Sequence, residues 1–198
     1  SWVTDMVSSS ISQQENRAFT IGDGEGGKPF GFLNHPATPH GEDITPGTVE
    51  CFKTGKKGDI DGPDVLIEMA TSLKPEYLSG ACWMMPRSVL TVMRIMQDES
   101  TGRHLWQPRL TAEFPETLLG YPIIINDDMP ALKPGTASIS LAFGNFNMAY
   151  QIVEKEGLTI LRDPYSAKPY VELYITKRVG GQVICPDAIK FLNFEGEA

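Results

Sequence analysis

The stretch LLGYPIIINDDMP, residues 118–130, runs three isoleucines directly into Asn126, Asp127 and Asp128 and then reaches Pro130. An apolar run of this kind is typical of a strand. Asn and Asp favour turns because their side chains bond nearby backbone groups, and Pro130 cannot donate to a strand ladder. Calcium loops place acids at alternating positions before a distant glutamate, a spacing that is missing here. The stretch therefore predicts a strand and the turn that ends it.

Composition and charge exclude several classes of protein. The chain has 198 residues, of which 41% are hydrophobic and 21% charged, as in ordinary globular domains. No apolar run approaches the roughly 20 residues of a membrane-spanning helix. A net charge of -8 disfavours a nucleic-acid reader, which would carry a basic stripe. Cys51, Cys82 and Cys185 are odd in number and far apart, which favours structural thiols over a disulfide framework or a zinc ribbon.

The pattern along the chain predicts an α+β protein. Residues 1–20 contain no Pro or Gly and predict one long helix, which Gly22 and Gly24 end in the left-handed conformation. Residues 28–62 are rich in Pro and Gly and predict a loop region with brief strands. Helices are expected in DGPDVLIEMATSL, with Pro63 at a first helical position and Pro75 ending or kinking it, and in PRSVLTVMRIMQD. Strands are expected in ACWMM, YPIII, ASISLAF, AYQIVE, GLTILRD, YVELYITKRV and AIKFLNF.

Two patterns resemble functional motifs without the context that those motifs need. Gly22, Gly24 and Gly27 match GxGxxG, and residues 22–28 nearly match a phosphate loop. Both motifs require a preceding strand and a following helix, whereas a helix precedes this segment and Pro29 follows it. The loop NHPATPHGED carries His35, His40, Glu42 and Asp43, but its prolines prevent the helical spacing of a zinc site. We expect no cofactor and no metal, and the residues by themselves indicate a protein that is not an enzyme.

Several segments in order resemble a known family. They are GDGEGGKPFGFL after a long helix, GRHLWQP, TLLGYPIIINDDMP, AFGNFNMAYQIVEKEGLTILRDPYSAKPYV and LYITKRVGGQVICPDAIKFLNF. Together they resemble the major capsid proteins of tailed phages, of the Hong Kong 97 type. The resemblance runs over nearly the whole chain.

The resemblance implies a capsid fold with two parts. A peripheral domain would comprise residues 1–33, with the long spine helix, and residues 154–198, with an antiparallel sheet; a mixed α/β axial domain would occupy residues 34–153. The loop STGRHLWQP would belong to the axial domain, and the expected contacts with neighbouring subunits are Arg103, His104, Trp106 and Arg109. Trp and Arg are residue types that often anchor interfaces.

Departures from the family pattern carry expectations of their own. Family members have an N-terminal arm and an extended loop before the spine helix, often after a scaffolding segment, so this chain is expected to be a fragment of the subunit. Some members form covalent Lys–Asn crosslinks with a catalytic Glu. Pro169 and Thr176 stand where that Asn and Glu would be, so we expect no autocatalytic crosslinking.

The expected function is structural. The resemblance implies a subunit that assembles with itself into pentamers and hexamers of an icosahedral phage or prophage head. The head would enclose double-stranded DNA without reading its sequence, and a scaffolding segment and a maturation protease would be further partners. The protein would reside in the virion and, during assembly, in the bacterial cytoplasm, with no membrane contact. The alternatives are an encapsulin-type compartment shell and a metal-dependent hydrolase that uses His35, His40 or His104.

Overall fold

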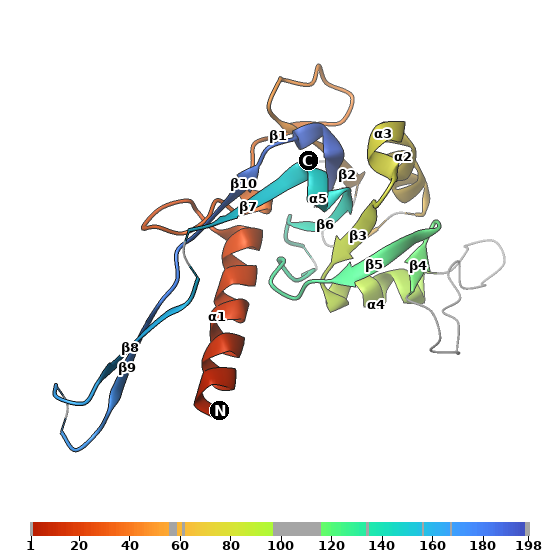
Figure 1. Cartoon of the computed structure of the whole chain (residues 1–198). Helices are drawn as coiled ribbons and strands as arrows, with labels where there is room; N and C mark the ends of the chain where they lie inside the picture. Colours follow the sequence, from red (N-terminus) through yellow and green to blue (C-terminus); the bar gives the residue numbers. More distant parts are fainter. Residues whose placement is uncertain are drawn as a thin grey trace.

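The computed structural model describes residues 2–55, 59–60, 62–96, 116–133, 135–155, 157–166 and 168–196. Within these residues the helices and 3₁₀ turns are α1 (Trp2–Ile21), η1 (Phe32–Asn34), α2 (Asp64–Ser72), α3 (Pro75–Leu78), α4 (Arg87–Ile95), α5 (Phe146–Ala149) and η2 (Pro186–Ala188). The strands are β1 (Ala37–Pro39), β2 (Val49–Gly55), β3 (Cys82–Met85), β4 (Thr117–Leu118), β5 (Tyr121–Ile125), β6 (Ile139–Gly144), β7 (Tyr150–Glu154), β8 (Thr159–Asp163), β9 (Glu172–Thr176), β10 (Val179–Val183) and β11 (Ile189–Gly196). Figure 1 shows a sheet with helices beside it and the β8–β9 hairpin, called the arm below, which extends away from it.

The main sheet is mixed and has the strand order β1-β2-β11-β6-β3-β5-β4. Strand β6 lies at its centre and runs antiparallel to both β11 and β3, whereas β2 and β5 pair in parallel with β11 and β3. Leu141, Ala142 and Phe143 of β6 are fully buried. A strand buried on both faces is expected to carry apolar residues in succession, as residues 141–143 do.

Both faces of this sheet carry a hydrophobic core. One cluster joins Trp83 and Phe143 to α2 and α4, through Leu66, Met69, Val89, Leu90 and Met93. The other cluster joins Ala142 and Phe191 to η1 and α5. Alternate residues of β6 and β11 supply the two clusters because side chains along a strand point to opposite faces. The helix expected in PRSVLTVMRIMQD is α4, in which Val89, Leu90 and Met93 are buried and Met96, just after it, is partly buried.

The predicted helices are present, with three refinements at their ends. Pro63 is the residue that precedes α2, and Pro75 begins a separate short helix, α3. The expectation for Gly24 is confirmed by its φ of +75°, but Gly22 does not have a positive φ. Gly22 is required for a different reason: a Cβ there would lie 2.2 Å from the carbonyl oxygen of Pro29 and 2.4 Å from that of Ala18. The chain passes too close for any side chain.

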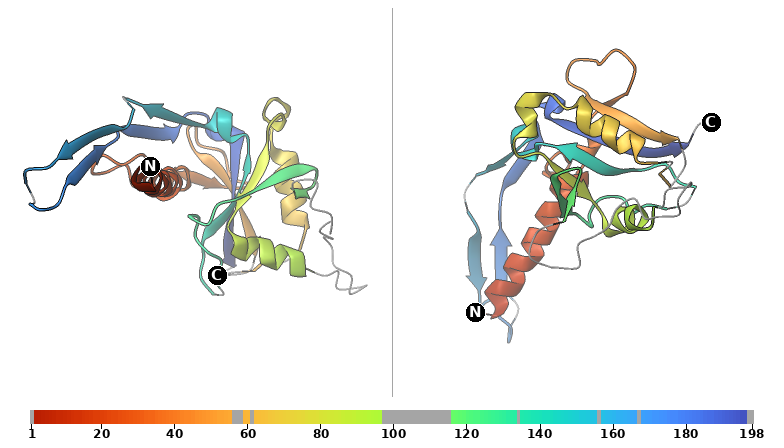
Figure 2. Two further views of the ribbon diagram at one scale, coloured as in Figure 1. Left: turned by 60° about the horizontal axis from the view of Figure 1, so that its bottom comes forward. Right: turned by 90° about the vertical axis from the view of Figure 1, so that its right-hand side faces the viewer.

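Strands β7, β8, β9 and β10 form two small antiparallel ladders outside the main sheet, β7 with β10 and β8 with β9. The strand predicted over YVELYITKRV is present as β9 but ends at Thr176, and β10, which pairs with β7 instead, was not predicted. The β8–β9 hairpin and α1 both extend away from the sheet (Figures 1 and 2). The division into a peripheral and an axial domain stays a prediction; β11, in its predicted peripheral segment, is hydrogen-bonded to β2 and β6 of the main sheet.

Candidate functional site

Helix α1 is fixed at its C-terminal end and exposed at the other. Asn34 in η1 donates through Nδ2 to the carbonyl oxygens of Ile21, at 3.0 Å, and Gly22, at 2.8 Å. These bonds satisfy carbonyls that the last helical turn leaves without an intrahelical partner. Near the N-terminal end, Trp2 and Met6 are 76% and 53% exposed.

In the described part of the chain, no helix has both the length and the apolar character needed to cross a bilayer.

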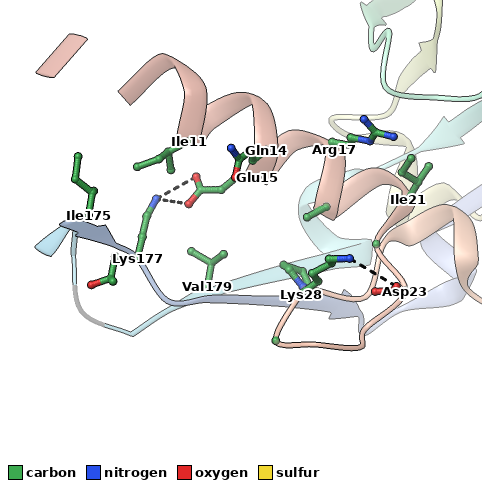
Figure 3. A pocket seen from close by; sticks show the side chains of 15 residues that line it. Ile11, Gln14, Glu15, Arg17, Ile21, Asp23, Lys28, Ile175, Lys177 and Val179 are labelled. Atoms are coloured by element: carbon green, nitrogen blue, oxygen red, sulfur yellow. Dashed lines mark hydrogen bonds and ion pairs between the residues drawn. The ribbon is translucent and has the colours of Figure 1, made fainter. Parts of the chain in front are cut away.

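A groove of about 750 Å³ lies between α1 and the segment that joins β9 to β10. Figure 3 shows its walls, with Ile11 and Ile21 of α1 on one side and Ile175 and Val179 on the other. Lys177 reaches across it. Its Nζ lies 2.8 Å from Oε1 of Glu15 on α1 and 3.5 Å from Oε1 of Glu154 on β7.

The cross-groove contact is ionic at neutral pH. The hydrogen bond to Glu15 is the largest cause that raises the pKa of Lys177 above its ordinary value, so the ammonium keeps its proton. The side chains of Lys177 and Glu15 are 23% and 18% exposed, so water screens this pair less than a fully exposed one. The pair connects α1 to the segment between β9 and β10 while leaving the apolar walls of the groove open.

The β8–β9 hairpin exposes apolar side chains on both of its faces. Residues paired across an antiparallel ladder share a face, so Ile160 and Ile175 lie on one face and Leu161 and Tyr174 on the other. Ile160, Leu161 and Tyr174 are 49%, 62% and 67% exposed. Leu173 of β9 is exposed as well. A two-stranded ribbon of this kind is at best marginally stable in water without further packing.

The trio Asn126, Asp127 and Asp128 forms a turn, as predicted. The backbone N–H of Asp128 donates to Oδ1 of Asn126 at 3.1 Å, and the backbone N–H of Asn126 donates to the carbonyl of Met85. Asp127 accepts from the backbone N–H of Arg87, the first residue of α4, and its other oxygen lies 3.1 Å from Nε of Arg87. The trio thus connects β5 to the junction of β3 and α4.

The histidines considered for a hydrolase have other partners. His40 Nδ1 lies 2.6 Å from Oε1 of Glu50, and its Nε2 lies 3.1 Å from Oε1 of Glu68. His35 Nε2 lies 2.8 Å from the carbonyl of Gly47. Among the described residues, no group of three or more His, Cys, Asp and Glu side chains could hold a metal ion.

Glu50 also bonds Lys190 at 2.6 Å inside the sheet. Burial alone would raise the pKa of this carboxyl, but the hydrogen bonds from Lys190 and His40 outweigh burial and hold the pKa below its ordinary value.

The four residues predicted for subunit contacts, Arg103, His104, Trp106 and Arg109, lie outside the described residues, and so does the hydrolase candidate His104. Their roles stay predictions. The sequence does not predict that the hairpin is exposed, because alternation of apolar and polar residues shows that the two faces of a strand differ in polarity but not what covers them.

Comparison with known proteins identifies the family. The model of the phage capsid family matches residues 1–194. The chain belongs to the phage capsid family. The resemblance inferred from the sequence is confirmed, and the protein is a structural capsid protein with an α+β capsid fold. Membership in this family makes it a component of the virion particle.

Solved capsid structures share the whole described fold. The capsid of an empty GTA particle, computed with C5 symmetry, matches with 36% identity and a TM-score of 0.88 over 98% of this capsid chain. The capsid of a native GTA particle, also with C5 symmetry, matches with 36% identity, a TM-score of 0.89 and the same coverage. The chain spans 66% and 65% of the lengths of those two chains.

A more distant match is Gordonia phage Cozz, with 14% identity and a TM-score of 0.58 over 98% of this chain and 63% of that chain. At that identity the match shows the fold alone. No protein of curated function matches the sequence.

Proposed function

We propose that this capsid chain is the shell-forming part of a major capsid protein that assembles with itself into the pentamers and hexamers of an icosahedral head. The observation that carries the proposal is the β8–β9 hairpin, with apolar side chains exposed on both faces. Such a ribbon needs partners, and contiguous exposed apolar surface is typical of protein interfaces. The C5 symmetry of the two related GTA capsids supports rings of identical subunits.

The enclosed cargo is double-stranded DNA in this proposal. The net charge of -8 supports a wall that contains DNA without gripping it, because cationic surfaces capture phosphates. Weak contacts between many copies suffice to hold such a shell, since closure makes them act together. A scaffolding segment and a maturation protease, acting in the bacterial cytoplasm, complete the proposed assembly route. The peripheral and axial division of residues 1–33 and 154–198 against 34–153 is part of the same proposal.

Negative-stain electron microscopy of the complete protein tests the proposal, with the hairpin variant Leu161→Asp as the decisive comparison. The parent protein should form closed shells, and Leu161→Asp should remain as small oligomers, because a charge replaces an apolar contact. Thr159→Asp is the matched control, since it adds the same charge on the same strand and face. It should assemble. Dispersed monomers from the parent protein, or shells from Leu161→Asp as abundant as the parent's, would contradict the proposal.

A further inference from the structure

Helix α1 leaves the main sheet from its C-terminal end, where Asn34 and the contact between Phe19 and Tyr150 hold it. A helix of 20 residues is about 30 Å long, and α1 is anchored near its C-terminal end. A rotation of about 5° at that end would displace the far end by roughly 2–3 Å, given the rise of each residue. Any contact near the anchored end therefore has a large effect on where the N-terminal half of α1 lies.

Asn126 supplies such a contact from the main sheet. Its Nδ2 donates to Oγ1 of Thr20, in the last turn of α1, at 3.0 Å. Thr20 is only 2% exposed, and its hydroxyl donates to the carbonyl oxygen of Asn16, with 2.8 Å between the two oxygens. The oxygen of Thr20 is thus left to accept, while Oδ1 of Asn126 is already an acceptor for Asp128. Both amide atoms of Asn126 are fixed by these partners.

The turn that carries Asn126 is itself well supported. It bonds Met85 at the end of β3 and, through Asp127, the first residue of α4. Thr20 is therefore tied to the junction of a core strand and a core helix. On another side of α1, Lys177 holds Glu15 across the groove (Figure 3). The hydrogen bond from Asn126 joins α1 to the main sheet, and the ion pair with Lys177 joins it to the segment between β9 and β10.

We propose that Asn126 is a positioning residue that sets the angle between α1 and the main sheet, and that this angle selects the curvature with which subunits join. The inference rests on the proposed function, because curvature has a meaning only in a shell. A small change in this angle would be repeated at every subunit of a shell.

The test uses Thr20→Val, which removes the acceptor with little change in shape, and Thr20→Ser, which keeps it. Shell diameters are measured by electron microscopy of the complete protein, and amide hydrogen exchange is measured on the unassembled subunit. Thr20→Val should give a broader range of diameters and faster exchange in α1, by roughly 2- to 10-fold for each hydrogen bond lost. Thr20→Ser should match the parent protein in both.

Asn126→Asp approaches the same bond from the other side. A carboxylate still accepts from the backbone N–H of Asp128 but cannot donate to Thr20, and the Thr20 hydroxyl can donate to it only by leaving the carbonyl of Asn16, so this variant should change diameters and exchange in the same direction as Thr20→Val. Combining the two should add little to Thr20→Val, because both remove the bond between residues 20 and 126. Parent-like diameters in both variants overturn the positioning role while leaving the proposed function intact. Loss of protection throughout β11 in both variants also contradicts it, as a general role in folding. If the parent protein forms no shells, the proposed function itself is contradicted.

Discussion

The main sheet and the arm of this capsid chain differ in how they are stabilised. In the sheet, Trp83, Phe143 and Phe191 are fully buried by helices and strands of the same chain. In the arm, Leu161 and Tyr174 form a cross-strand pair that remains mostly exposed. The sheet completes its core within one subunit, whereas the arm has apolar surface left for neighbours. We infer that folding and assembly are assigned to different parts of the molecule.

The largest expected effect contrasts a buried with an exposed aromatic residue. Phe143→Ala should destabilise the unassembled subunit by about 3–5 kcal/mol, because it leaves a cavity beside Trp83 and Tyr121. Tyr174→Ala in the arm should change the free energy of unfolding by less than about 0.5 kcal/mol. Denaturant titration of both variants measures the difference. Equal losses would show that the arm is part of the folding core, contrary to the comparison above.

An intermediate effect is expected for the buried ion pair between β2 and β11. Glu50→Gln should cost about 2–3 kcal/mol at pH 7, because Lys190 is left as a buried charge. The control is Glu195→Gln, which breaks a contact with Lys53 between the same strands but at the surface, and should cost less than about 1 kcal/mol.

The pH dependence of the Glu50 contribution has a definite sign. Because the pKa of Glu50 is lowered in the folded protein, its contribution is present above the ordinary value of 4.5 and is lost as pH falls through the folded pKa. The stability difference between the parent and Glu50→Gln should therefore shrink below pH 4.5. Unfolding curves at several pH values measure it, and a constant difference down to full protonation would rule the pair out as its origin.

The smallest effect concerns the turn at residues 126–128, where Asp127 contacts the start of α4. Asp127→Ala should destabilise the subunit by about 1 kcal/mol, since it removes the acceptor for the first backbone N–H of α4. Asp127→Asn keeps an acceptor and loses only the contact with the exposed Arg87 side chain, so it should be nearly neutral. Thermal unfolding of the two variants separates the cap from the ion pair. A loss of the same size in both would assign the effect to charge.

Local patterns predicted most of the elements correctly. The α1 helix, the strand ACWMM and the turn at residues 126–128 follow from periodicity and from the chemistry of Asn, Asp and Pro. The failures involve long-range partners. Strand β10, which follows the predicted strand β9 and pairs with β7, was not predicted, and Gly22 is required by the approach of Pro29 rather than by its own φ.

The sequence by itself determined the α+β class, the family and the turn after β5, because these depend on neighbours along the chain or on motifs in order. Only the tertiary structure decided that Leu161 and Tyr174 are exposed, that Asn126 reaches Thr20, and that Lys177 spans a groove to Glu15. Those pairings join residues up to 162 positions apart. Such contacts depend on how the elements pack in three dimensions, and no local pattern of apolar and polar residues specifies that packing.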